Sequence, residues 1–182
     1  MKLFLSLDKS ENNDELLNIV NHNPQITVTD TIEENTFVLV NGPLTHLSNM
    51  LLRDYTLADK IEKILLVGGS DSYGDVTPVA ERNIYEDPES AQHVFLSGIP
   101  IVMFGLNVTR NLENRALLPL AYLFKPQIFD TEECGVFVET KAAKTRGMTV
   151  TDLYSDKQFD KHYVEMVKGF DREKLGELLK HA

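Results

Sequence analysis

The sequence predicts an α/β protein with an open, mostly parallel sheet and helices on both faces. Short runs of β-branched and aliphatic residues alternate along the chain with segments whose apolar residues recur at helical spacing. Two runs, 64–67 and 99–104, are almost wholly apolar, as expected of central strands that helices cover on both sides. A regular alternation of strands and helices is typical of a parallel sheet.

The predicted elements of the first half follow one another without a long linker. A strand at 3–7 precedes a capped helix, which ends at the His-Asn-Pro run 22–24. Two strand-like stretches come next, and a second helix begins at Pro43. The supporting residues are the caps Asn12, Asn13 and Asp14, the inward Leu16, Leu17 and Val20, the stretches 26–29 and 37–40, and the stripe Leu44, Leu47 and Leu51.

The second half continues the alternation and then becomes harder to assign. Asp87 and Pro88 are typical of a helix start, and Ala91, Val94 and Phe95 form its inward face. Helices are expected at 117–124 and 171–180, with a strand at 135–140, whereas 163–167 fits a strand or a helix. No repeat or linker divides the chain, so one domain is expected over residues 1–182.

Composition excludes several classes of function. The net charge is −10, which argues against nucleic acids and anionic membranes as partners. No apolar run approaches the ~20 residues of a membrane span, and the N-terminal apolar stretch is too short for a signal peptide. Cys134 is the only cysteine, so no intrachain disulfide can form, and a cytoplasmic setting is expected.

A polar segment, GDVTPVAERNIYEDPESA at 74–91, leaves the predicted strand that ends in Gly68-Gly69. Parallel sheets bind ligands at the carboxyl ends of their strands, where this segment begins. Glu81 and Asn83 are alternate residues, so in an extended segment they project to one side. We expect them to converge with Asp75 on an acidic pocket for a hydroxyl-rich ligand. The alternative is a solvated loop with only local hydrogen bonds.

Several motifs carry a family resemblance. They are GPLTHL at 42–47, KILLVGG at 63–69, the block at 74–91, GLNVT at 105–109, LAYLFKP at 120–126 and TRGMTVTD at 145–152. Together they resemble the inosine–uridine-preferring nucleoside hydrolases, from about Asn41 to the C-terminus. The resemblance implies the fold of that family in a shortened form, and hydrolysis of the N-ribosyl bond as its ancestral chemistry.

The resemblance also implies a ribose pocket. In the family pattern, the residues matching Asp75, Glu81 and Asn83 bind the ribose. Glu81 and Asn83 match that pattern, whereas Asp75 stands where the family has Asn and so lacks an amide donor. Arg82 replaces an aromatic residue, which removes an apolar wall for the sugar.

The catalytic half departs further from the family. Its first strand ends in carboxylates that hold calcium and activate water, and here only Asp8 keeps a carboxylate, with the Asn41 carbonyl as a further implied ligand. Calcium is typically bound by 6–8 oxygen ligands that include charged carboxylates. No cofactor is therefore expected, unless the family's calcium site is retained. The departures are Ser6, Asn12 and Asn13 for carboxylates, Ser10 for a glycine, and Arg115-Ala116 for a His-Asp pair.

Three functions follow from this reading. The chain is a non-catalytic binder of a nucleoside or ribose-like ligand, a weak N-ribosyl hydrolase that uses Asp8, or an assembly module. Because helices of the family are absent here, we expect uncovered apolar surface and a homo-oligomer. The leucines expected on that surface are Leu112, Leu117, Leu118 and Leu120.

Simpler explanations account for other residues. Helix capping explains Asp8 and the Asn12-Asn13-Asp14 run without a metal. Cys134 lies beside Glu132 and Glu133, which disfavours a nucleophilic thiolate. The histidines show no spacing typical of metal ligands or nucleophile pairs, and His46 is expected at the surface; they are His22, His46, His93, His162 and His181.

Overall fold

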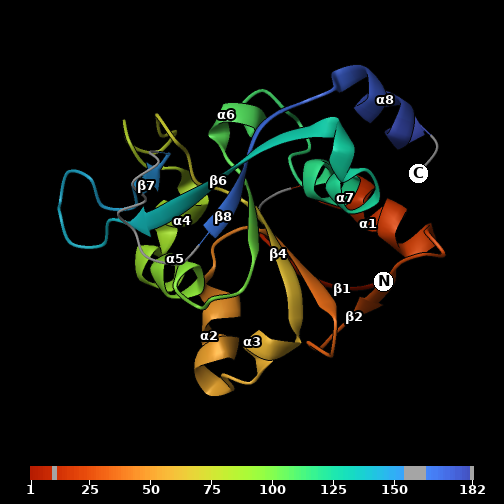
Figure 1. Ribbon diagram of the computed structural model, residues 1–182, viewed down its shortest axis with the longest axis horizontal. Helices are drawn as coiled ribbons and strands as arrows, with labels where there is room; N and C mark the ends of the chain where they lie inside the picture. Colours follow the sequence, from red (N-terminus) through yellow and green to blue (C-terminus); the bar gives the residue numbers. More distant parts are fainter. Residues whose placement is uncertain (10–11, 154–162, 181–182) are drawn as a thin grey trace.

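Eight strands form one sheet in the computed structural model, which describes residues 1–9, 12–153 and 163–180 (Figure 1). Across the sheet the strands lie in the order β2-β1-β3-β4-β5-β8-β6-β7. Their bounds are β1 Lys2–Leu7, β2 Thr27–Thr29, β3 Thr36–Asn41, β4 Ile61–Val67, β5 Ile101–Phe104, β6 Phe129–Val138, β7 Thr149–Asp152 and β8 Tyr163–Phe170.

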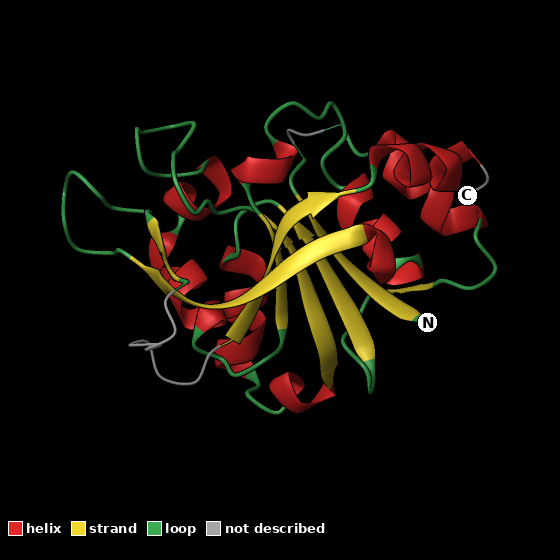
Figure 2. Cartoon of the chain, turned by 45° about the horizontal axis from the view of Figure 1, so that its top comes forward, coloured by secondary structure: helices red, strands yellow, loops and turns green. Residues whose placement is uncertain are grey.

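Neighbouring strands from β2 across to β8 are parallel. Strand β6 is antiparallel to β8, and β7 is antiparallel to β6. Figure 2 shows the parallel strands fanning out beneath the long, curved β6. The predicted open, mostly parallel sheet is therefore confirmed.

Helices cover both faces of the sheet. On one face, α2 and α5 pack against the inward residues of β3, β4 and β5. On the other face, α1, α7 and α8 pack against the alternate residues of the same strands. The helix bounds are α1 Asp14–His22, α2 Thr45–Arg53, α3 Leu57–Lys60, α4 Arg82–Glu86, α5 Pro88–Phe95, α6 Leu106–Thr109, α7 Leu117–Phe124 and α8 Arg172–Lys180, with a 3₁₀ turn η1 at Pro126–Ile128.

The central strand β4 shows why its sequence is apolar throughout. Ile64 and Leu66 belong to the core beneath α2 and α5, while Leu65 belongs to the core beneath α7. Because both faces of the strand are covered, alternation of polar and apolar residues is lost. The start of α5 is also as predicted, since the Asp87 carboxylate accepts the Ser90 N–H and Pro88 occupies the first turn.

Some element predictions were wrong in detail. The second helix begins at Thr45 rather than at Pro43, and Leu17 of the first helix is 37% exposed while Ile19 is buried. The ambiguous segment 163–167 is a strand, because it fills the place between β5 and β6. The strand expected at 135–140 begins earlier, at Phe129.

The apolar surface expected for self-association is not exposed. Leu117, Leu118 and Leu120 are at most 7% exposed and pack into the chain's own core, and Leu112 packs partly against it. These leucines were expected to lie on an uncovered apolar surface, but three of them belong to helix α7, which packs against the sheet. That part of the prediction was wrong.

No helix among the described residues combines the length and the apolar character needed to cross a bilayer.

Candidate functional site

Polar residues gather where β1, β3 and β4 end. In the strand register Leu7 lies beside Asn41, and Asn41 lies beside Val67. Asp8 and Gly68 directly follow two of these positions, so they lie at the same edge of the sheet. Neighbouring strands are roughly 4.8 Å apart, which keeps these groups within the span of one small ligand.

Glu81 and Asn83 meet at the glycine pair that ends β4. Glu81 Oε2 accepts the Gly69 N–H at 3.0 Å and the Ile84 N–H at 3.3 Å, and Asn83 Nδ2 donates to the Val67 carbonyl at 2.8 Å. A Cβ at Gly68 would lie 3.1 Å from Glu81 Oε2, so a side chain there would crowd the carboxyl. Gly69 adopts a left-handed φ of +76°, which favours glycine.

The two side chains are brought together by a helix start rather than by an extended segment. Glu81 is the N-cap of α4, and Asn83 lies in the first turn of that helix. Both are almost fully buried, whereas Arg82 between them is exposed. The expectation of an extended conformation was therefore wrong, although Arg82 does point away.

Glu81 has the properties of a carboxyl that exchanges a proton near neutral pH. Burial raises its pKa from 4.5 to about 7, against the lowering effect of the hydrogen bond from Gly69. Its second oxygen, Oε1, is buried and has no hydrogen-bond partner among the described residues. The carboxyl can thus accept a hydrogen bond or, when protonated, donate one.

Asp75 takes a different position from the other two predicted binding residues. Its side chain is exposed, and Oδ1 accepts the Arg82 N–H at 2.9 Å at the start of α4. Its charge still contributes to raising the pKa of Glu81. The structure therefore brings Glu81 and Asn83 together and places Asp75 at the rim, where it holds the loop.

A chain of amides joins the ends of β1 and β3. Asn41 Nδ2 donates to Asn13 Oδ1 at 3.1 Å, and Asn13 Nδ2 donates to the Asp8 carbonyl at 3.0 Å. Asn13 is the N-cap of α1 by position, but its side chain makes no capping bond. Asn12 caps the helix as expected, because its Oδ1 accepts the Asp14 N–H. The prediction that the Asn13 side chain also caps the helix was wrong.

The oxygen donors near Asp8 do not fit calcium, which the resemblance implies. Calcium prefers 6–8 oxygens with carboxylate charge. Asp8 is the only carboxylate at this strand end among the described residues, the Asn41 carbonyl already accepts the Asp8 N–H at 2.6 Å, and the Asn13 oxygen accepts from Asn41. Within residues 1–9, 12–153 and 163–180, no three His, Cys, Asp or Glu side chains are grouped to hold a metal ion. Ser10 lies outside the described residues.

Arg115 and Ala116 stand where the resemblance implies a His-Asp pair, and neither is a carboxylate or an imidazole. Ala116 is fully buried and packs with Leu3, Leu16 and Leu39, so an acid or a ligand is absent at this point.

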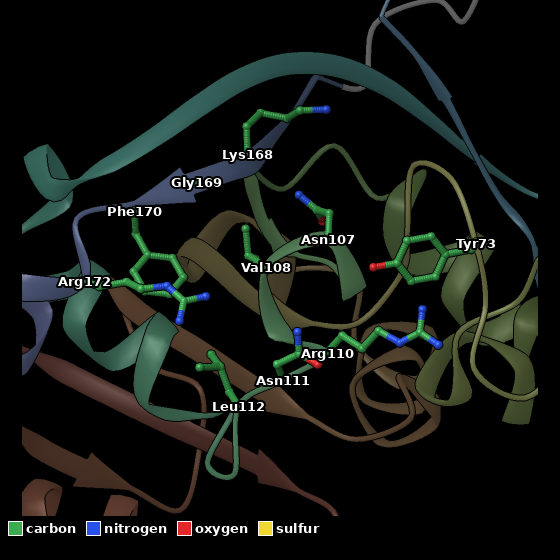
Figure 3. A pocket seen from close by; sticks show the side chains of 10 residues that line it. All are labelled: Tyr73, Asn107, Val108, Arg110, Asn111, Leu112, Lys168, Gly169, Phe170 and Arg172. Carbon is green, nitrogen blue, oxygen red and sulfur yellow. The ribbon is translucent and has the colours of Figure 1, made fainter.

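Two pockets open along the carboxyl edge of the sheet. One, of about 510 Å³, is bounded by Asp8, Gly42, Thr45 and His46 at the ends of β1 and β3. His46 is exposed, as expected, and its ring lies 5.9 Å from that of Phe4. The other, of about 250 Å³, lies at the ends of β5 and β8 (Figure 3).

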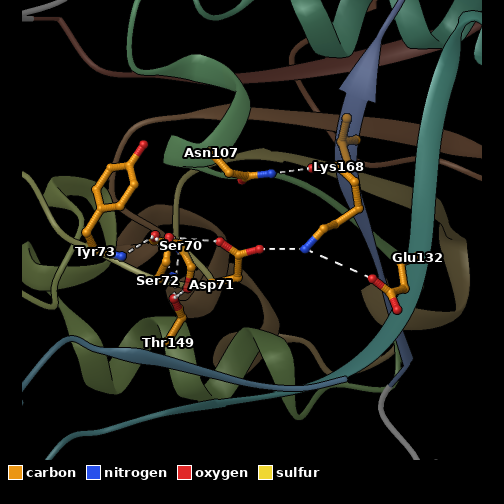
Figure 4. A network of polar contacts seen from close by, with 9 residues as sticks. Ser70, Asp71, Ser72, Tyr73, Asn107, Glu132, Thr149 and Lys168 are labelled. Atoms are coloured by element: carbon orange, nitrogen blue, oxygen red, sulfur yellow. Dashed lines mark hydrogen bonds and ion pairs between the residues drawn. The ribbon is translucent and has the colours of Figure 1, made fainter. Parts of the chain in front are cut away.

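Thr149, in the edge strand β7, holds Ser70 in the turn that follows Gly69 (Figure 4). Its hydroxyl accepts the Ser70 N–H at 2.8 Å and donates to the Ser70 carbonyl at 2.5 Å. Sequence reasoning missed this residue, although it lies in the TRGMTVTD motif at 145–152. That motif was the only sequence signal for Thr149. It does not reveal that Thr149 bonds to Ser70, which lies 79 positions away in the chain.

The remaining titratable candidates take structural positions. Burial, reinforced by Glu132, raises the pKa of the Cys134 thiol to about 11, which leaves little thiolate at neutral pH. His93 Nδ1 pairs with the Ser48 hydroxyl at 2.9 Å, and His22 Nδ1 lies 2.8 Å from the Asn18 carbonyl. His162 and His181 lie outside the described residues.

Comparison with known sequences identifies relatives. Residues 7–119, more than half of the chain, match the family described as inosine-uridine preferring nucleoside hydrolase. The pyrimidine-specific ribonucleoside hydrolase RihA of Shewanella oneidensis is 35% identical over 159 residues, covering 64% of this chain and 50% of that protein. RihA of Salmonella enteritidis PT4 is 35% identical, with 64% and 51% covered. The chain thus spans about half the length of the curated relatives it matches.

Solved structures show the same fold. The plant nucleoside hydrolase PpNRh1 superposes with a TM-score of 0.71 at 22% identity, covering 80% of this chain and 61% of that one. A purine-preferring ribonucleoside hydrolase from Gardnerella vaginalis gives a TM-score of 0.69 at 20% identity, covering 94% and 65%.

Proposed function

The chain belongs to the inosine-uridine preferring nucleoside hydrolase family, and on this premise we propose that it binds the ribose part of a nucleoside, or a similar polyol, with impaired hydrolysis. The binding residues are Glu81 and Asn83, with Asp75 at the rim. The observation that carries the proposal is Glu81 Oε1, a buried carboxyl oxygen without a partner among the described residues.

A sugar hydroxyl supplies what this oxygen lacks. Leaving a buried acceptor unsatisfied costs about 1–3 kcal/mol, part of which a donated hydrogen bond recovers. Asn41 Oδ1, on the neighbouring strand, is a second buried acceptor that lacks a partner in the described structure. Asn41 ends β3, and Glu81 is held against the end of the adjacent β4 through Gly69, so two acceptors are offered to the hydroxyls of a ribose. A neutral polyol is favoured over an anion here, because Glu81 and Asp75 are acidic.

Hydrolysis needs more than binding. Breaking an N-ribosyl bond requires an activated water and a group that protonates or stabilises the departing base. Arg115 and Ala116 offer no such acid, and Asp8 alone remains of the carboxylates at the end of β1. Losing one catalytic group typically costs ~10²–10⁴-fold in rate, so turnover is expected to be marginal or absent.

One observation favours the second candidate, a weak N-ribosyl hydrolase. Asp8 borders the pocket of about 510 Å³ together with Thr45 and His46. A carboxylate that borders a pocket is the type of group that can activate a water for N-ribosyl hydrolysis. The assembly module, by contrast, has lost the exposed leucines that suggested it. The cytoplasmic setting remains an inference from the single buried Cys134.

Binding is tested by titrating ribose and uridine into the protein while following backbone amide NMR signals. We expect millimolar affinity, with shifts at Gly68 and Gly69 that Glu81→Gln and Asn83→Ala abolish. Glu86→Gln, an exposed change on the same helix, is the matched control. No shift at these glycines at tens of millimolar ligand would overturn the proposal. Turnover of uridine or inosine at ~1–10³ per second would establish the hydrolase instead.

A further inference from the structure

The pocket of about 250 Å³ at the ends of β5 and β8 is lined by hydrogen-bond donors (Figure 3). None of the residues described around it is acidic, and its polar groups are three cationic side chains, a phenol and two amides. They are Arg110, Lys168, Arg172, Tyr73, Asn107 and Asn111. The chain carries 28 acidic and 18 basic residues, so three cationic side chains in a lining that includes no acidic residue is not what the composition predicts.

The two arginines approach the pocket from different helices. Arg110 follows α6, and its guanidinium lies 4.6 Å from the centroid of the Tyr73 ring. Arg172 is the first residue of α8, and its guanidinium lies 5.8 Å from the centroid of the Phe170 ring. Aromatic contacts of this kind orient a guanidinium without neutralising it. Neither arginine forms an ion pair with any acidic residue in the described part of the chain.

Unlike the two arginines, Lys168 forms ion pairs with acidic side chains (Figure 4). Its ammonium lies 2.6 Å from the Asp71 carboxylate and 4.0 Å from that of Glu132. Its charge is therefore largely compensated at the pocket rim. The excess positive charge of the pocket comes from Arg110 and Arg172.

Asn107 is held rigidly in the pocket wall. Its Nδ2 donates to the Val167 carbonyl at 2.8 Å, which links α6 to β8. A Cβ at Gly105 would lie only 2.7 Å from Asn107 Oδ1, so the glycine leaves the space that the amide occupies. The pocket wall thus combines an amide fixed by a hydrogen bond with two exposed arginines that rest against aromatic rings.

We propose that this pocket binds a phosphate group, either free phosphate or the phosphate of a small phosphomonoester. Guanidinium groups bind phosphate oxygens through paired, charge-assisted hydrogen bonds. The volume is below the ~300–1,000 Å³ typical of drug-sized ligands, which suits a small anion. Glu81 and Asn83 do not line this pocket, so the site is independent of the proposed ribose binding.

Calorimetric titration with inorganic phosphate and with ribose 5-phosphate, at constant ionic strength, tests the proposal. We expect dissociation constants on the order of millimolar. Arg110→Gln and Arg172→Gln are each expected to weaken binding by roughly tenfold or more, because each removes a charged hydrogen-bonding group. Arg53→Gln makes the same change of charge at an exposed position in α2 and is expected to have no effect.

The outcomes separate the sources of the anion. Equal affinity for both ligands identifies free phosphate, and at least tenfold tighter binding of ribose 5-phosphate identifies a phosphomonoester. Glu81→Gln is expected to leave the affinity for inorganic phosphate unchanged, which separates this site from the ribose site. If Arg53→Gln weakens binding as much as Arg110→Gln and Arg172→Gln do, or if chloride competes as well as phosphate does, the attraction is diffuse charge and the proposal fails.

Discussion

Glu81 and Gly69 are joined by a hydrogen bond of 3.0 Å from the backbone N–H of Gly69 to Oε2 of the carboxyl, although they are 12 positions apart. The bond ties the polar loop at 74–81 to the end of β4. It also places a buried carboxyl beside a residue whose φ of +76° favours glycine. The shape of the site and its response to pH therefore depend on the same contact.

Stability should depend on pH through Glu81. Burial raises the pKa of this carboxyl to about 7, whereas in the unfolded chain it stays near 4.5. Between these values the folded protein holds the proton more tightly than the unfolded chain, so stability falls as pH rises from 4.5 to 7. The loss attributable to this group is about 3 kcal/mol.

Urea unfolding of the wild type and of Glu81→Gln across this range isolates the effect. The glutamine keeps an oxygen for the two backbone amides but does not titrate, so the difference between the two curves should change with pH. Glu86→Gln, whose carboxyl is exposed, should follow the wild type at every pH. A constant difference between wild type and Glu81→Gln would show that the carboxyl titrates normally.

Gly69→Ala should destabilise the protein more than Gly98→Ala does. Both glycines have a similar left-handed φ, +76° and +81°. A Cβ at Gly69 would lie 2.9 Å from Met103 Sδ, whereas one at Gly98 meets nothing within 4 Å. Backbone strain costs about 1–2 kcal/mol at either site, and only Gly69 adds a steric clash. Equal melting temperatures for the two variants would contradict this reading.

Thr149→Val should destabilise the fold by about 1–3 kcal/mol, because it leaves the buried Ser70 N–H without its acceptor. The substitution keeps the branched shape of the side chain and replaces the hydroxyl with a methyl group. Thr151→Val, on the same strand but partly exposed, is the control and should change stability by less than ~0.5 kcal/mol. Chemical denaturation of both variants measures the difference, and similar values for the two would show that the hydroxyl is dispensable.

Calcium should not be held tightly. Among the described residues, the end of β1 offers one carboxylate, Asp8, beside neutral amides, and Ala116 supplies no carboxylate. We expect millimolar calcium to leave the melting temperature within about 1 °C, since a ligand stabilises only as far as its concentration exceeds Kd. Metal analysis after gel filtration is the check, and one calcium per chain in that analysis would refute the expectation.

The sequence predicts the sheet well because apolar runs report burial directly. The stretch 64–67 is four apolar residues in succession, short and bounded by Gly68-Gly69, which is typical of a strand covered on both faces. The same reasoning could not assign 163–167 to a strand or a helix, because its apolar residues fit both the two-residue period of a strand and the 3.6-residue period of a helix. Its place between β5 and β6 is fixed by hydrogen bonds to distant strands.

The site was harder to read than the fold. Glu81 and Asn83 were found from spacing and from family resemblance, yet their convergence comes from a helix start that the polar sequence did not reveal. Asn13 was expected to cap its own helix and instead bonds to Asn41, 28 positions away. Such pairings depend on which strand ends become neighbours, and no local pattern encodes that.

Strand β8 separates β5 from β6 in the sheet, although it is the last of them in the chain. During synthesis, β1 to β5 can therefore pair in succession as each emerges from the ribosome. Within the described part of the chain, strands β6 and β7 pair only with each other until residues 163–170 have been made. The edge of β5 that pairs with β8 likewise stays unpaired until these residues have been made. A chain stalled before β8 thus presents two unsatisfied edges at once, a state prone to pairing with other chains.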